Sequence, residues 1–279
     1  MTYNIIMKKT IPTLGVTSAT LINTLKRSGK NIFTLEEAAK IYGKGTHATG
    51  KFLSTLLKRN IVVRIKAGIY LILQPGLEEV QLSNWPIIAR ELSRPNNYYI
   101  AYYSAMRIHG MTTHPLLSIY ITSTKRFRDK KINNIEYHFI FSKKENFWGA
   151  GIFWISKQEK VIVSDIERTI LDGLERPELC GGLVEVIRGI WSKQKEINWV
   201  KLKDYSKKFH AKSVLKRLGF ILEKLEINKK MVLFLKKELS TKKDYVLLDP
   251  AGLKEGKYVK NWGLRLNMNI EEITESIWG

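Results

Sequence analysis

Three carboxylates, Asp165, Glu167 and Asp172, lie close together in the stretch SDIERTILD, and closely spaced carboxylates can hold the Mg²⁺ of a nuclease. Helix formation explains the same residues. Ser164 and Glu167 have the spacing of a capping box, Asp165 falls in a first turn, and Arg168 and Asp172 are spaced as an i,i+4 ion pair. We therefore predict a structural helix without a catalytic role, and a metal-dependent nuclease remains the alternative.

The other groups that could do chemistry are five histidines and one cysteine. The histidines include no HxxxH pair, and HGMTTH is a weak metal-ligand spacing. Cys180 has no evident activating base, so we expect a buried structural thiol. The chain contains no Walker loop, no dinucleotide-binding glycine fingerprint and no G-x-S-x-G elbow. We therefore predict that the protein is not an enzyme and has no metal or cofactor. The histidines are His47, His109, His114, His138 and His210.

A different chemistry is indicated by Thr46–Lys58, whose pattern is that of an amphipathic helix. At about 100° per residue, His47, Lys51, Ser54 and Lys58 fall within an arc of roughly 60°. Apolar residues occupy the opposite side. A major groove about 12 Å wide admits one helix, short polar side chains read base edges, and lysines contact phosphates. This spacing predicts a helix that binds duplex DNA.

Two shorter helices and a β-hairpin must position this segment. SATLINTLKRSGK predicts the first helix, and TLEEAAKIYG predicts the second, in which Thr34 and Glu37 form a capping box. IVVRI and IYLIL predict two strands joined through Lys66-Ala67-Gly68, with Arg64 behind the tip. Three helices followed by a hairpin are the order of a winged helix-turn-helix, whose hairpin is placed to contact the DNA backbone or minor groove.

The distribution of charge supports a polyanionic partner. The formal charge of +21 is large for a chain of 279 residues. Residues 1–75 contain 12 Lys or Arg and 2 acids, a balance of +10, and residues 201–239 contain 12 and 4, a balance of +8. These two segments therefore hold 18 of the 21 excess charges. Nucleic acid fits this pattern better than a membrane surface, and a basic protein-binding module remains an alternative.

Length and composition indicate an ordered protein of one large or two ordinary domains, because 44% of the residues are hydrophobic. The single cysteine excludes an internal disulfide and fits a reducing cytoplasm. We see no export signal and no run of about 18 apolar residues, and so expect no membrane span. The predicted fold class is α+β, with an N-terminal winged helix-turn-helix domain at 1–75 (core about 17–73) and a larger mixed α/β domain at 76–279.

Two further basic stretches allow more than one interpretation. KRFRDKK, residues 125–131, lies between two predicted strands and is either a solvated hairpin tip or a nucleic-acid contact. Residues 201–239 predict a helical, basic sub-region with one apolar face. Its basic side chains are either solvated or contact a phosphate or an acidic partner. They are Lys207, Lys208, Lys212, Lys216 and Arg217.

Several of these stretches resemble the AbiEi antitoxins of type IV toxin–antitoxin systems. The resemblance rests on TLEEAAKIYG, the helix Thr46–Lys58, VRIKAGIYLI, YYSAMRIHGM, ERTILDGLERPELCGG, VLKRLGFILEKL and LLDPAGLKEGKYVKNWGLRLN. It covers nearly the whole chain from about residue 17. The ERTILDGLERPELCGG stretch is the most distinctive of these, since a winged helix alone is generic.

The resemblance implies a cytoplasmic DNA-binding repressor and antitoxin. The N-terminal domain would bind inverted repeats in its own promoter, and the C-terminal domain would counter a nucleotidyltransferase toxin without a stable complex. No membrane contact is implied. The operator sequence, the oligomeric state and the identity of the toxin stay open. The residues that the resemblance places on DNA are His47, Thr49, Lys51, Ser54, Thr55 and Lys58, with Arg64 and Lys66 in the wing.

Overall fold

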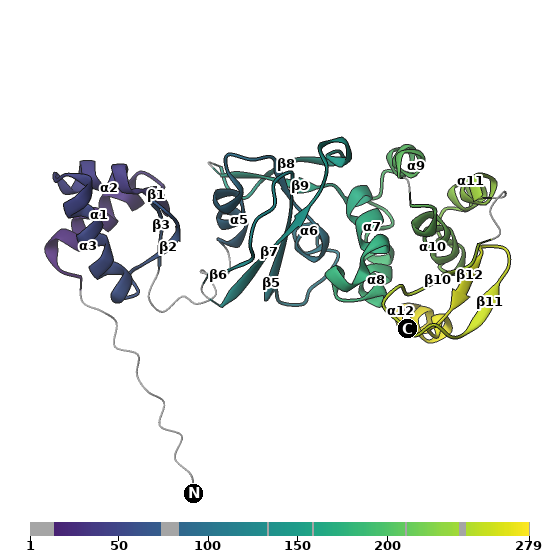
Figure 1. Cartoon of the computed structure of the whole chain (residues 1–279). Helices are drawn as coiled ribbons and strands as arrows, with labels where there is room; N and C mark the ends of the chain where they lie inside the picture. The colour runs from purple at the N-terminus through teal and green to yellow at the C-terminus, as the bar shows by residue number, and fades with distance from the viewer. Residues whose placement is uncertain are drawn as a thin grey trace, which may run out of the picture. The chain divides into compact units, whose positions relative to one another are not determined.

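The protein is mixed α+β in the computed structural model (Figure 1), which describes residues 14–73, 84–132, 134–157, 159–209, 211–239 and 244–278. The chain divides into two compact units. The first comprises Met1–Arg94, Lys131–Asn134 and Trp154–Glu159, and the second comprises Pro95–Lys130, Ile135–Phe153 and Lys160–Gly279. The predicted boundary between residues 75 and 76 lies outside the described residues. None of the described helices is both long and apolar enough to cross a bilayer.

The first unit contains short helices and a three-stranded sheet. Its elements are α1 (Val16–Arg27), β1 (Ile32–Thr34), α2 (Leu35–Tyr42), α3 (Thr46–Lys58), β2 (Val62–Lys66), β3 (Ile69–Ile72) and α5 (Trp85–Ser93). The sheet order is β1-β3-β2, with both pairings antiparallel. The three predicted helices and the hairpin are present. The sequence analysis missed β1, a strand of only three residues that becomes regular through its pairing with β3.

Local signals explain where the helices of this unit begin and end. The predicted capping box is confirmed, since the Thr34 hydroxyl accepts from the Glu37 amide and the Glu37 carboxylate accepts from the Thr34 amide. The turn from α3 into β2 passes through Asn60, whose φ of 52° is left-handed, a conformation that asparagine tolerates. Helices α1, α2 and α3 bury one face each around Leu21, Leu25, Phe33, Ala38, Leu53 and Leu56.

The second unit is built around most of a six-stranded sheet of order β6-β7-β5-β4-β9-β8. The strands are β4 (Tyr98–Ile100), β5 (Ser118–Ser123), β6 (Lys130–Ile132), β7 (Ile135–Phe141), β8 (Ala150–Trp154) and β9 (Lys160–Ser164). β4 pairs antiparallel with β5 and parallel with β9, and β5 pairs parallel with β7. Residues 125–131 are therefore not the tip of a hairpin between β5 and β7, because parallel strands need a crossover. β6 occupies the end of that crossover.

Helices and a small second sheet complete this unit. They are α6 (Tyr102–Ile108), α7 (Ile166–Glu175), α8 (Leu183–Lys193), α9 (Trp199–Lys208), α10 (Lys212–Lys224), α11 (Lys229–Leu239) and α12 (Ile270–Trp278), with 3₁₀ turns η1 (Lys144–Asn146) and η2 (Pro177–Cys180). The small sheet has the order β10-β12-β11 and comprises β10 (Val246–Leu247), β11 (Lys257–Val259) and β12 (Leu264–Leu266). The predicted helical sub-region 201–239 consists mainly of α9, α10 and α11.

Helix α10 is the centre of the packing in this region. Leu218 and Ile221 are fully buried, and Gly219 packs against the indole of Trp262. A Cβ atom at Gly219 would lie 2.0 Å from the Trp262 ring, so only glycine allows the indole to approach the helix so closely. The Trp262 Nε1–H donates to the Glu223 carboxylate at 2.5 Å, which orients the ring.

Candidate nucleic-acid interface

Helix α3 presents one buried side and one exposed side. It begins after Gly45, which has an extended backbone and provides no side-chain cap, and its first turn contains no acidic residue. The positive end of the helix dipole is therefore not neutralised by a side chain of the first turn. Leu53 and Leu56 are fully buried in the core of the first unit, which fixes the rotation of the helix about its axis.

The exposed side of α3 brings together most of the predicted contact residues. Five of them are exposed: His47, Lys51, Ser54, Thr55 and Lys58. The Ser54 hydroxyl donates to the Gly50 carbonyl at 2.9 Å and the Thr55 hydroxyl to the Phe52 carbonyl at 2.7 Å, so each oxygen keeps its capacity as an acceptor. The surface offers a mixture of polar and cationic groups on one helix face. We name these five residues the α3 outer face.

The prediction that Thr49 contacts DNA from this surface is wrong. Its side chain is fully buried, and its hydroxyl lies 3.2 Å from the Lys44 carbonyl and 3.0 Å from the Gly45 carbonyl. Two residues of an α-helix correspond to about 200°, so Thr49 points away from His47. It closes the N-terminal turn of α3 instead.

The two predicted contact residues in the hairpin between β2 and β3 have different surroundings. Arg64 is exposed, as predicted. The Lys66 ammonium donates to the Glu91 carbonyl and, at 3.1 Å, to the Arg94 carbonyl, at the C-terminal end of α5. Cations are favoured at this negative end of a helix dipole. The structure thus assigns Lys66 to holding α5, contrary to its predicted role as a free phosphate contact in the wing.

Few acidic side chains oppose the charge of this region. Residues 14–73 contain ten Lys or Arg and two acids, Glu36 and Glu37, a balance of 10 − 2 = +8. Burial alone would raise the pKa of Glu37, but its hydrogen bonds to Lys30 and to the Thr34 amide lower it below the ordinary value. Glu37 therefore neutralises Lys30 and caps α2, and the α3 outer face carries no carboxylate of its own.

Some residues of the second predicted basic surface are exposed in the structure, and others are buried. Lys207 and Lys208 are exposed at the end of α9, and Lys212 is half-buried. Lys216 and Arg217 are buried at 3% and 5% exposure, so the prediction of phosphate or partner contacts is wrong for both. Lys216 donates to the Asp244 carbonyl, and Arg217 donates to the carbonyls of Leu174 and Leu247. The amphipathic pattern missed this because it assigns every charged side chain to solvent.

The three carboxylates of the nuclease alternative are each engaged by protein groups. Asp165, not Ser164, is the N-cap of α7, so the predicted capping box is wrong, and the Asp165 carboxylate also accepts from the Tyr205 hydroxyl at 2.9 Å. Glu167 is 3% exposed, and its carboxylate accepts from the Asn198 backbone amide at 2.7 Å. The predicted ion pair between Arg168 and Asp172 is confirmed at 2.8 Å. Within the described residues, no group of three or more His, Cys, Asp or Glu side chains is arranged to hold a metal ion.

The cysteine and the described histidines of the second unit are buried or lie close to other protein groups. Cys180 is fully buried, as predicted, and burial raises the pKa of its thiol well above the ordinary value. His109 hydrogen-bonds the Ser164 carbonyl at 2.6 Å, and His138 hydrogen-bonds Asp129 at 2.7 Å. His114 lies 3.9 Å from Glu185, and His210 lies outside the described residues.

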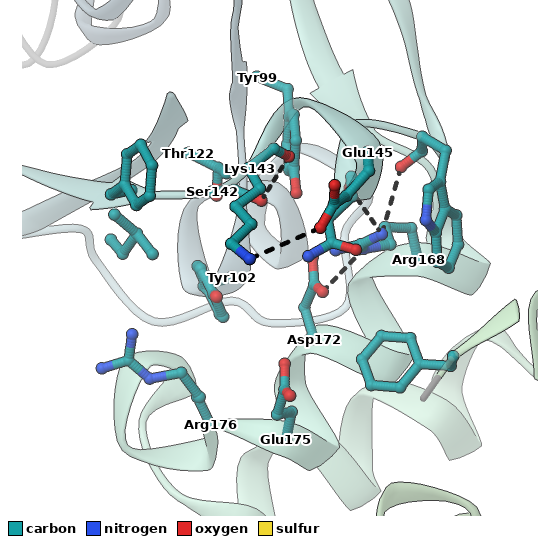
Figure 2. Close-up of a pocket in the computed structure, with 15 residues that line it drawn as sticks. Tyr99, Tyr102, Thr122, Ser142, Lys143, Glu145, Arg168, Asp172, Glu175 and Arg176 are labelled. Carbon is teal, nitrogen blue, oxygen red and sulfur yellow. Dashed lines mark hydrogen bonds and ion pairs between the residues drawn. The ribbon is translucent and has the colours of Figure 1, made fainter. Parts of the chain in front are cut away.

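Sequence analysis gave no sign of a pocket of about 870 Å³ in the second unit (Figure 2). Its walls come from β4, the start of α6, the end of β7 with the following 3₁₀ turn, and α7. Asp172 and Arg168 lie at its floor, and Tyr99 and Tyr102 line one wall. Local periodicity in the sequence does not predict such a pocket, because its lining residues are far apart in the chain.

Comparisons with known proteins give information on the fold. No model of a protein family matches the sequence, and no curated protein matches it. The structure is similar to the crystal structure of the RV2827C protein from Mycobacterium tuberculosis, with a TM-score of 0.68, 13% sequence identity, and coverage of 96% of this chain and 97% of that chain. At this identity the similarity shows a shared fold, which extends over both units.

Proposed function

We propose that the first unit is a winged helix-turn-helix domain and that the protein is a DNA-binding transcriptional repressor that places α3 in the major groove of its own promoter. The observation that carries the proposal is the α3 outer face, on which His47, Lys51, Ser54, Thr55 and Lys58 are exposed together while Leu53 and Leu56 fix the opposite side in the core. The size and chemistry of this face suit a helix that contacts base edges and phosphates in the major groove. Arg64 would add a backbone contact from the hairpin.

The sequence resemblance supports a second part of the proposal. On that basis the second unit acts as the antitoxin of a type IV toxin–antitoxin system and opposes a nucleotidyltransferase toxin. The α3 outer face and the second unit would then perform separate tasks. Repression and toxin neutralisation should accordingly be separable by mutation.

Salt-dependent DNA binding tests the repressor proposal. The double variant Lys51→Ala with Lys58→Ala should bind the promoter duplex more weakly, and the slope of log affinity against log salt should fall by about 1.8, because each lost phosphate contact contributes about 0.9. Fluorescence anisotropy with a labelled promoter duplex measures both quantities. The matched control is Lys229→Ala with Lys230→Ala, which removes two exposed lysines from α11 in the second unit.

A slope that is equal in the two double variants would contradict the assignment of α3. If the basic surface instead served an acidic protein, neither variant would bind the promoter specifically. For the antitoxin proposal, which requires a nucleotidyltransferase toxin encoded beside this protein, the Lys51→Ala with Lys58→Ala variant should still rescue growth when that toxin is expressed. Loss of rescue in that variant would show that the two tasks are not separate.

A further inference from the structure

The pocket of the second unit shares no residue with the α3 outer face, and the proposed function does not use it. It is lined by side chains of β4, β5, β7, α7 and the start of α6, and by the loop after β7. Its volume of about 870 Å³ is within the range of small-molecule sites, which is about 300 to 1,000 Å³.

The floor of the pocket has an unused hydrogen-bond acceptor. Asp172 is 1% exposed, and its Oδ1 accepts from Arg168 Nε at 2.8 Å, but its Oδ2 has no hydrogen-bond partner among the described residues. Figure 2 shows the Asp172 side chain rising from α7 between Tyr102 and Arg168. A buried carboxylate oxygen without a donor is unfavourable, and such groups often mark a functional site.

Arg168 cannot turn to supply this missing donor. Its guanidinium lies 4.1 Å from the centre of the Trp148 ring and 5.6 Å from that of Phe209. It also donates to the Asn146 carbonyl at 3.3 Å and to the Trp148 carbonyl at 3.5 Å. Close packing restrains the side chain further, since Gly149 has a φ of 72° and a Cβ atom there would lie 2.8 Å from the Arg168 Cβ. The Asp172 Oδ2 acceptor therefore remains without a donor from Arg168.

A strained residue forms the wall next to Asp172. Tyr102 has a φ of 52°, in the left-handed region that a bulky side chain rarely adopts. The residue is 6% exposed and is the first residue of α6, separated from β4 by Ala101 alone. Backbone strain of this kind is concentrated at ligand and active sites, where the surrounding fold maintains it. The strain places an aromatic ring and its hydroxyl beside the carboxylate.

The charges of the lining cancel. Above pH 7, where Asp172 is ionised despite its raised pKa of about 7, three cationic side chains, Lys143, Arg168 and Arg176, face three anionic ones, Glu145, Asp172 and Glu175. At the rim, Lys143 and Glu145 pair at 3.8 Å. A pocket with this balance does not select a multiply charged anion. Its aromatic members instead favour a flat ring, because base–aromatic stacking is favourable for every nucleobase. They are Tyr99, Tyr102, Phe141, Trp148 and Phe209.

We propose that this pocket binds a nucleoside through an amino group on its base, which donates an N–H to Asp172 Oδ2 while the ring lies against the aromatic wall. A nucleoside is uncharged, its base is flat, and three of the four common bases carry the required amino donor. Its ribose hydroxyls suit the polar rim around Ser142 and Glu175. Guanosine, adenosine and cytidine carry an amino group and are preferred to uridine, which has a carbonyl oxygen at the position of the cytidine amino group.

Isothermal titration of the full-length protein with guanosine, adenosine, cytidine, uridine and GTP, above about pH 8 where Asp172 is ionised, tests the proposal. At least one amino-bearing nucleoside should bind saturably and more tightly than uridine, and GTP should bind more weakly than guanosine. Asp172→Asn replaces the acceptor by an NH₂ group and should weaken binding by about tenfold or more, as expected for a hydrogen bond to a charged group. Lys144→Ala, at an exposed neighbour that does not line the pocket, is the control and should leave binding unchanged.

A second variant keeps the test decisive if Asp172→Asn does not fold. Ser142→Trp fills the pocket from the half-buried loop after β7 and should abolish nucleoside binding without altering the buried ion pair. Three results would overturn the proposal. They are the absence of saturable binding for all four nucleosides, tighter binding of GTP than of guanosine, and equal affinity in the wild type and the Ser142→Trp variant.

Discussion

The buried carboxyl of Asp172 should make the stability of the second unit fall as pH rises from about 4 to about 7. Burial raises the pKa of Asp172 from its ordinary value of 3.8 to about 7, although Arg168 opposes the shift. Below pH 3.8 the folded and unfolded chains both carry the proton. Between these two pKa values the unfolded chain has released it while the folded chain retains it, so the folded state is progressively disfavoured. Above about pH 7 both states are ionised and the effect is constant.

The size of this effect follows from the two pKa values. The difference of 7 − 3.8 = 3.2 units corresponds to about 4 kcal/mol at about 1.36 kcal/mol per unit. The charged neighbours of Asp172 are Arg168, Glu175 and Asp165, and the two carboxylates raise its pKa as burial does. Asp172→Asn removes the titration and keeps a side chain of the same shape. The free energy of unfolding of the wild type should therefore fall relative to that of the variant by up to about 4 kcal/mol across this range.

Urea unfolding followed by tryptophan fluorescence, at intervals from pH 4 to pH 8, measures this difference. Glu178→Gln, which removes an exposed carboxylate from the neighbouring η2 turn, gives the baseline for the loss of a surface charge. If the wild type gains stability over Asp172→Asn as pH rises through the same range, the ion pair with Arg168 dominates over burial. The carboxyl would then be ionised throughout, and the reasoning from burial would be refuted.

Further predictions concern the first unit and the packing of α10. Arg64→Gln should lower the salt slope of promoter binding by about 0.9, whereas Lys66→Gln should leave it unchanged, because the Lys66 ammonium is held by α5; equal slopes for both variants would contradict the different roles. Gly219→Ala should destabilise the protein by about 3 kcal/mol or more through overpacking against Trp262, as thermal unfolding will show; a melting temperature equal to that of the wild type would contradict this packing. Thr34→Ala should cost about 1 kcal/mol in urea unfolding through loss of the capping box, and Thr34→Ser should restore it; equal stabilities of the two variants would remove the cap as the cause.

Local signals in the sequence predicted the first unit well. The bounds of α3 and the capping box at Thr34 are as expected, because helix periodicity and caps depend on residues a few positions apart. The exposure of His47 and Lys58 follows from the same periodicity. β1 was missed because its three residues are regular only through pairing with β3. Thr49 was placed on the surface by resemblance alone, and helical geometry already pointed the other way.

The second unit was less predictable because its contacts are long-range. Lys216 and Arg217 were expected at a surface, but carbonyls of Asp244, Leu174 and Leu247 satisfy them in the interior. No pattern within α10 reveals those partners, which lie 28 to 43 residues away. The parallel pairing of β5 and β7 and the pocket around Asp172 depend on the same kind of distant contact.

The strand pairing within two of the three sheets bears on how the chain folds while it is being synthesised. All strands of the β1-β3-β2 sheet lie between Ile32 and Ile72, so this sheet can close as soon as that segment has left the ribosome. In the larger sheet, Ile100 of β4 pairs with Val163 of β9, 163 − 100 = 63 residues later. Contacts so distant in sequence form slowly. The amino-terminal helices and hairpin are thus complete while β4 still waits for its neighbour, which separates the two folding events in time.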